Sequence, residues 1–203
     1  PSPPQWLLAE LRDVELAPYP KVGETIDVLA AWHGVEPDCV LPVAGVAEAF
    51  TLVARGLRYR HPTVIHPQFT EPEAALRAAG VLPQRVLLWP EEGFRLDVGR
   101  VPDAADLVFV GNPTNPTGVL HPADEIRRLI RPGRVIVVDE AFMDAVPGES
   151  QSLLRGDLTG VLVLRSLTKT WGLAGLRVGY IIGDPTLIAA LRRIQTPWAV
   201  SSP

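Results

Sequence analysis

The sequence predicts an α/β fold in which a mostly parallel central sheet carries helices on both faces. Short runs rich in Val, Ile and Leu alternate with segments of helical periodicity, which is the order of elements in parallel sheets covered by helices. Runs such as 107–110 and 135–138 are apolar throughout, whereas a strand with one face in water alternates apolar and polar residues. These strands are therefore expected to be buried on both faces.

Six segments have the length and composition of strands in such a sheet. They are residues 63–66, 85–89, 107–111, 134–139, 161–165 and 178–182. Helices are predicted over residues 5–12, 24–33, 46–55, 71–79, 122–130 and 185–195. Pro72 and Pro122 lie near first-turn positions, and Asp184 precedes Pro185 as a cap residue precedes a first-turn proline.

Length and composition exclude several classes of protein. The 203 residues are 47% hydrophobic, which suits one substantial domain or two small ones and excludes a disordered chain. A net charge of −4 offers no basic stripe for nucleic acid. No apolar run reaches the roughly 18 residues of a membrane span, and no signal peptide or metal-binding motif is visible. Cys39 is the single cysteine, which suits a cytoplasmic protein. From the net charge and the lack of a long apolar run, we expect neither a nucleic acid nor a membrane partner.

Two residue counts limit which side chains could supply a reactive amine or an asparagine amide. Of the 19 basic residues 17 are arginine, so a reaction that needs a lysine amine has only Lys21 and Lys169 to use. The two asparagines, Asn112 and Asn115, lie three residues apart.

Three polar or Gly-rich segments follow the ends of predicted strands. They are residues 111–118, 139–144 and 166–175. In open α/β sheets ligands bind outside the carboxyl ends of the strands, so the three segments are expected to meet at one pocket.

The first two segments each allow a structural and a functional interpretation. Asn before Pro, twice in residues 111–118, is ordinary turn chemistry, but an Asn amide at a strand end can also donate a hydrogen bond to a ligand oxygen. Asp139 follows four apolar residues and needs a partner, because an unpaired buried carboxylate is costly. That partner is either a helix end or an arginine, or the protonated ring nitrogen of a pyridine-type cofactor.

The third segment is the most specific. Ser166 lies three residues before Lys169, and Arg177 lies eight residues after it. Partial desolvation of Lys169 would lower its pKa and favour the neutral amine, which can form an imine. The hydroxyl of Ser166 and the guanidinium of Arg177 suit a phosphate. The alternative is a solvated loop lysine.

Together the three segments resemble the pyridoxal-phosphate-dependent aminotransferases of fold type I, classes I and II. Within that group the sequence is most similar to the subfamily of histidinol-phosphate aminotransferases and threonine-phosphate decarboxylases of corrinoid synthesis. The resemblance implies pyridoxal 5'-phosphate as cofactor. It also implies transfer of an amino group between a small phosphorylated amino substrate and a 2-oxo acid. Decarboxylation of threonine phosphate is the alternative, and a truncated, non-catalytic cofactor-fold module is an alternative of another class.

The resemblance implies roles for five residues of the motifs. Lys169 matches the lysine that binds the cofactor aldehyde and moves the α-proton, and Asp139 matches the carboxylate paired with the pyridine nitrogen. Asn115 matches the donor to the phenolic oxygen of the ring. Ser166 and Arg177 match ligands of the phosphate.

Four further residues are matched outside these segments. Val46 and Ala47 stand where the family has a polar turn that opens a helix, so only their main-chain amides would bind the phosphate. Phe69 matches the aromatic residue that stacks on the ring. Tyr19 resembles a tyrosine that reaches across a homodimer, although it could instead pack in a local turn with its neighbouring prolines.

Two departures from the family are visible. Phe142 stands where the family often has a tyrosine that contacts the phenolic oxygen. Family members also continue into a C-terminal small domain, with an arginine for the substrate carboxylate, that this sequence does not contain. We therefore expect residues 1–203 to form the cofactor-binding large domain, with 1–35 an arm that contributes to a dimer. Either the chain is a fragment of a longer protein, or its site lacks a wall on the substrate side.

Overall fold

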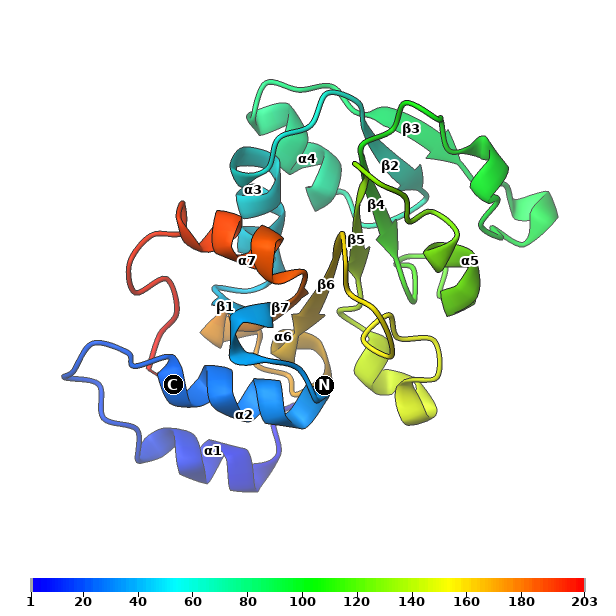
Figure 1. The fold of residues 1–203 in the computed structure, drawn as a ribbon. Helices are drawn as coiled ribbons and strands as arrows, with labels where there is room; N and C mark the ends of the chain where they lie inside the picture. Colours follow the sequence, from blue (N-terminus) through cyan, green and yellow to red (C-terminus); the bar gives the residue numbers. More distant parts are fainter. Residues whose placement is uncertain (1, 203) are drawn as a thin grey trace.

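A mixed sheet with helices on both faces forms the centre of the protein (Figure 1). The computed structural model describes residues 2–202, and within them seven strands take the order β1-β7-β6-β5-β4-β2-β3. The strands are β1 (Val40–Val43), β2 (Pro62–His66), β3 (Gln84–Leu87), β4 (Leu107–Gly111), β5 (Val135–Asp139), β6 (Val161–Ser166) and β7 (Gly179–Gly183). Both neighbours of β7 pair with it antiparallel, and the other four pairs are parallel. The predicted α/β class and the six predicted strands are confirmed.

Strand β1 was not predicted. It has only four residues, and one of them, Pro42, has no N–H to donate to a neighbouring strand. The position is tolerated because β1 lies at the edge of the sheet and pairs only with β7.

The helices lie close to their predicted positions. They are α1 (Gln5–Arg12), α2 (Gly23–His33), α3 (Val46–Gly56), α4 (Glu71–Ala78), α5 (Ala123–Arg127), α6 (Leu167–Thr170) and α7 (Pro185–Arg192). Short 3₁₀ helices are η1 (Pro37–Cys39), η2 (Pro90–Glu92), η3 (Val98–Arg100), η4 (Met143–Ala145), η5 (Pro147–Glu149) and η6 (Ala174–Leu176). The expected cap of α7 forms, because the Asp184 carboxylate accepts the Thr186 N–H at 2.8 Å.

Two helix predictions were too long and one helix was missed. Both α5 and α7 end three residues before the predicted bounds. After α5 the chain tightens into three-residue turns, in which the N–H groups of Leu129 and Ile130 bond to Ile126 and Arg127. The four-residue helix α6 lies in what was expected to be a loop.

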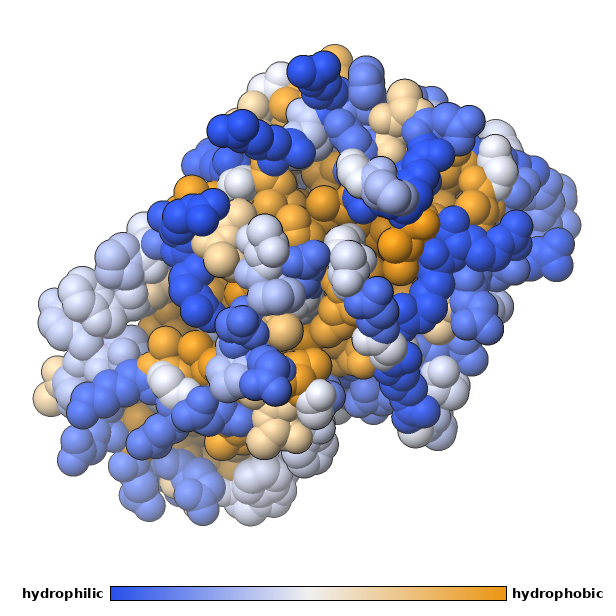
Figure 2. Space-filling model, in the orientation of Figure 1, coloured by the Kyte–Doolittle hydropathy of each residue, from blue (hydrophilic) through white to orange (hydrophobic). Residues whose placement is uncertain are grey.

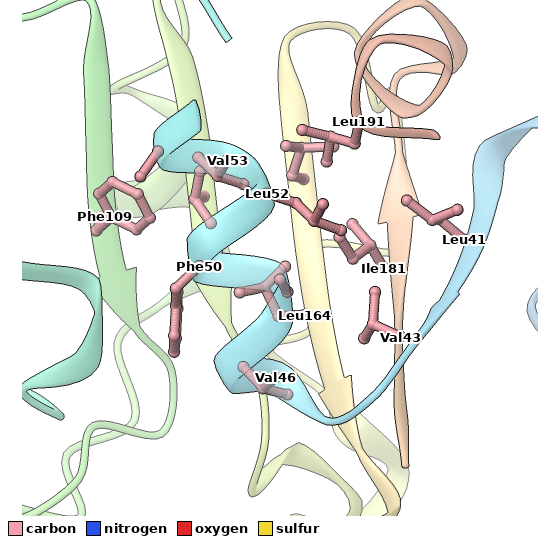
Figure 3. Close-up of a cluster of buried hydrophobic side chains, with 14 of the residues drawn as sticks. Leu41, Val43, Val46, Phe50, Leu52, Val53, Phe109, Leu164, Ile181 and Leu191 are labelled. Carbon is pink, nitrogen blue, oxygen red and sulfur yellow. The ribbon is translucent and has the colours of Figure 1, made fainter. Parts of the chain in front are cut away.

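Helices α3, α4 and α7 cover one face of the sheet. Phe50 and Val53 of α3 are 1% and 0% exposed, and they pack among Phe109, Leu164 and Ile181 of the strands (Figure 3). These apolar contacts fix the start of α3 against the sheet, because the hydrophobic effect favours every buried methylene group by about 0.8 kcal/mol.

Helices α2 and α5 cover the other face. Ile126 of α5 packs with Ile136 and Val138, and Ala30 of α2 packs with Val40. Successive residues of β5 therefore enter opposite cores, which confirms the prediction that its apolar run is buried on both faces.

The N-terminal segment carries much exposed apolar surface. Helix α1 has no buried residue, and α2 buries only Ala30. Exposed fractions are 59% for Trp6, 76% for Leu16, 66% for Val28 and 79% for Trp32. Hydrophobic residues also reach the surface in the lower left of Figure 2, over the region of α1 and α2. Among residues 2–202 no helix combines the length and the apolarity that crossing a membrane requires.

Candidate active site

One pocket lies at the carboxyl ends of β4, β5 and β6, where the three polar segments were expected to meet. The empty space within it, including the open mouth, is about 630 Å³. Of the predicted site residues it is lined by Val46, Ala47, Phe69, Asn115, Asp139, Ser166, Lys169 and Arg177. Residues that are far apart in the sequence, from Val46 to Arg177, thus meet in one pocket at the end of the sheet.

Asp139 ends β5 and lies partly buried in the pocket wall. Its Oδ1 accepts the Ala141 N–H at 3.1 Å. Burial raises the pKa of Asp139 to about 6, although the Ala141 N–H and the charge of Lys169 oppose the rise. A carboxylate in this state gains from a cationic ligand atom placed beside it.

Lys169 lies on α6 and projects into the pocket. Its Nζ is 5.6 Å from the centroid of the Phe142 ring, a distance at which the ring face attracts an ammonium group. Phe142 thus offers an aromatic face, but no hydroxyl, to the pocket. The other lysine, Lys21, lines a different groove, so Lys169 is the lysine of this pocket.

The residues that were expected to bind a phosphate meet where α3, β6 and the segment before β7 come together. The Oγ atoms of Ser166 and Thr168 are 2.7 Å apart, and both residues line the pocket. Gly45 caps α3 with φ +80°, and a Cβ atom there would lie 3.1 Å from Nη2 of Arg177. The guanidinium therefore lies against the start of α3, whose first N–H groups have no partner within the helix. Helix N–H groups, hydroxyls and a guanidinium together suit a phosphate.

Thr168 was missed by the sequence reasoning. It is buried and bonded to Ser166, so it belongs to the same hydroxyl pair. The signal was available, because a second hydroxyl residue directly precedes Lys169.

The two asparagines have different environments. Asn112 is fully buried, accepts the His121 N–H at 2.8 Å and donates to the carbonyl groups of His121 and Gln151 at 3.2 and 3.1 Å. These bonds brace the loop that carries Asn115, which is exposed and lines the pocket. The turn interpretation therefore describes Asn112, while the amide of Asn115 is free to meet a ligand.

Phe69 supplies an aromatic ring at the edge of the pocket. It is 40% exposed, and its ring centroid lies 6.4 Å from that of the buried Phe50. The neighbouring Gln68 is buried and donates to the carbonyl groups of Ile65 and Phe109 at 2.7 and 3.1 Å. Gln68 therefore fixes the short loop from which Phe69 projects.

Tyr19 is the predicted site residue that does not line this pocket. It is 69% exposed, and its ring stacks on Trp198 with centroids 4.3 Å apart. It borders a separate groove with Leu167 and Tyr180. Within the described part of the chain, no three His, Cys, Asp or Glu side chains are grouped to hold a metal ion.

The fold and the pocket define the large-domain architecture of fold type I pyridoxal-phosphate enzymes. Among solved structures, histidinol-phosphate aminotransferase from Sinorhizobium meliloti, in complex with pyridoxal-5'-phosphate, superposes with a TM-score of 0.85 at 22% identity. The match covers 99% of this chain and 58% of that chain. Residues 4–203 match the family model described as aminotransferase class I and II, and the chain belongs to this family.

Curated relatives carry two different names. A histidinol-phosphate aminotransferase of Mycobacterium tuberculosis is 50% identical over 205 residues, covering 98% of this chain and 56% of the relative. A threonine-phosphate decarboxylase of Pseudomonas aeruginosa is 37% identical over 193 residues, covering 91% of this chain and 55% of the relative. The chain thus spans just over half the length of the relatives it matches.

Proposed function

We propose that the protein is a pyridoxal-phosphate-dependent aminotransferase. It moves an amino group between a phosphorylated amino compound of the histidinol-phosphate kind and a 2-oxo acid. The observation that carries the proposal is the convergence of Lys169, Asp139, Asn115, Ser166 and Arg177 on one pocket. Family membership and the 50% identical relative named histidinol-phosphate aminotransferase support it.

The residues of the pocket fit this cofactor. A Cβ atom at Gly45 would lie only 3.1 Å from Nη2 of Arg177, so the glycine lets the guanidinium lie close to the start of α3, where Val46 and Ala47 line the same pocket. The Ser166 hydroxyl completes this phosphate site. Phe69 offers a ring face for stacking, and Asn115 offers an amide donor for a phenolic oxygen.

Lys169 and Asp139 then carry the chemistry. When bound, pyridoxal phosphate supplies an aldehyde for the substrate amine and a ring that accepts the electrons left by α-proton removal. The Lys169 amine would hold the cofactor through its aldehyde and would move the α-proton of the substrate as a general base. The Asp139 carboxylate would keep the proton on the ring nitrogen, and because burial raises its pKa to about 6, a cationic ring nitrogen beside it would favour its charged form.

Decarboxylation of threonine phosphate is the second candidate. The relative named threonine-phosphate decarboxylase favours it, and the same lysine, carboxylate and anion site would serve either reaction. The two reactions differ in the bond broken at the α-carbon, which depends on how the substrate is oriented above the ring.

The test supplies the full-length protein with pyridoxal phosphate and each substrate. Consumption of the 2-oxo acid with histidinol phosphate supports the aminotransferase, and release of carbon dioxide from threonine phosphate supports the decarboxylase. Substitution Asp139→Ala should nearly abolish either turnover. Cofactor binding without any turnover would instead identify a non-catalytic binding module.

We further propose that residues 1–203 act as the cofactor-binding large domain of a homodimer, with 1–35 as the arm at the interface. Supporting observations are the exposed Trp6, Leu16 and Trp32 in the arm, because apolar residues gathered on a surface mark contacts with other chains. Tyr19 lies in the same arm and would reach the partner's phosphate site.

A further inference from the structure

A buried ionic network lies directly behind the pocket. Arg165 is 1% exposed and Glu140 is 0% exposed, and their side chains meet at 3.0 Å. Nη1 of Arg165 also bonds to Asp144 at 2.8 Å, and Nη2 bonds to Glu149 at 2.5 Å. Ser152 donates to Glu140 at 2.8 Å. None of these residues lines the pocket.

The network is attached to the two strands that carry the pocket residues. Glu140 follows Asp139, and Arg165 precedes Ser166. Because successive side chains of a strand point to opposite faces, the ion pair lies on the face opposite to Asp139 and Ser166. The backbone continues the same connection, since the Glu140 N–H donates to the Leu164 carbonyl at 2.9 Å.

Stability does not explain this arrangement. Burying a charged pair usually costs as much as it gains, and apolar residues of similar volume often stabilise a protein as well or better. Burial raises the pKa of Glu140 to about 7 even with Arg165 beside it. The Nε of Arg165 is buried without a hydrogen-bond partner in the described residues. A buried arginine held by three carboxylates therefore points to another role.

The arrangement can fix the distance between the two strand ends. The guanidinium of Arg165, a residue of β6, reaches Glu140, which directly follows β5, and Asp144 in η4. Any sliding of β5 against β6 would break several charged hydrogen bonds at once.

We propose that Arg165 and Glu140 are positioning residues that hold Asp139 and Ser166 at the spacing the cofactor requires. The inference rests on the proposed function, because it gives those two residues the ring nitrogen and the phosphate as ligands. Loss of the ion pair between Arg165 and Glu140 should weaken the contacts of Asp139 and of Ser166 with the cofactor at the same time.

The experiment measures the dissociation constant of pyridoxal phosphate, by absorbance titration of the full-length protein, for Arg165→Met, Arg165→Lys and Glu140→Gln. We expect Arg165→Met to raise the dissociation constant about tenfold, as loss of supporting residues does at metal sites. The lysine variant keeps the charge and should lose less. For the cofactor-saturated variants, kcat should fall while KM for the amino substrate changes little.

Arg134→Met is the matched control. Arg134 is also buried, at 6% exposed, but it precedes the amino end of β5, whereas the pocket lies at the carboxyl end. It donates to the carbonyl groups of Ala105 and Pro102 at 2.6 and 2.8 Å. It should lower the melting temperature without changing cofactor affinity.

The outcomes separate the two proposals. If Arg165→Lys and Glu140→Gln bind the cofactor as the unaltered protein does, the positioning role is wrong. The same conclusion follows if Arg134→Met, at equal loss of melting temperature, weakens binding by the same factor. Should Arg165→Met fail to fold, the lysine and glutamine variants decide. Failure of the unaltered protein to bind pyridoxal phosphate would overturn the proposed function itself.

Discussion

Replacing Asp139 with asparagine should stabilise the cofactor-free protein while removing its function. The carboxylate is partly buried and its pKa is raised to about 6, mainly because burial disfavours the charged form. Asparagine has nearly the same shape and keeps an oxygen to accept the Ala141 N–H. It carries no charge, so it avoids the cost of desolvating a carboxylate.

The magnitude follows from the two pKa values. The difference between 3.8 and about 6 corresponds to about 3 kcal/mol of free energy of unfolding. Because the folded pKa is the higher one, the folded state binds the proton more tightly, and the unaltered protein loses stability as the pH rises from about 4 to about 6. The advantage of Asp139→Asn should therefore be near zero at pH 4 and reach about 3 kcal/mol at pH 8.

The assay is urea denaturation of both cofactor-free proteins between pH 4 and pH 8. Asp27→Asn, an exposed position of α2, serves as the control for general effects of charge removal and should show no comparable pH dependence. An advantage of Asp139→Asn that is absent, or equal at every pH, would refute the conclusion that burial in the pocket disfavours the charged form of Asp139. With the cofactor bound, the unaltered protein should regain the difference, because the ring nitrogen supplies the missing cation.

Three further predictions concern the loop that carries the two asparagines and the dimer. Asn112→Ala should lower the free energy of unfolding by about 3 kcal/mol, since it leaves buried main-chain groups of His121 unpaired. Asn115→Ala should instead leave unfolding by urea within about 0.5 kcal/mol and weaken binding of pyridoxal phosphate. For the dimer, mixing Tyr19→Phe chains with Lys169→Ala chains should restore activity above either parent, because one site of the mixed dimer is intact. No recovery after proven subunit exchange would exclude a shared site.

Much of the fold could be predicted because buried parallel strands have a strong sequence signal. The run that forms β5 is apolar over four residues, and its strand begins within one residue of the prediction. Strand β1 could not be predicted in the same way, because its four residues include Pro42 and its pairing with β7 is set by the tertiary fold. The ends of α5 and α7 were misjudged because sequence periodicity does not show where a helix tightens into shorter turns.

The pocket was predictable because its residues follow strand ends in three recognisable segments. What the sequence could not show is which polar groups brace the loops and which face the pocket. Asn112 and Asn115 have the same chemistry and the same following proline, yet one is buried and the other lines the pocket. The network around Arg165 could not be predicted either, because Glu140 follows β5, the other members that bind Arg165 come from η4 and η5, and all of them meet only in the folded chain.

The central claim is that this pocket binds pyridoxal phosphate through Lys169. It is tested most directly by reducing the cofactor-loaded protein with borohydride, digesting it and locating the cofactor by mass spectrometry. The account predicts a stable cofactor adduct on Lys169 and none in a Lys169→Ala variant treated in parallel. An adduct on Lys21 alone, or equal labelling of the Lys169→Ala variant, would contradict it.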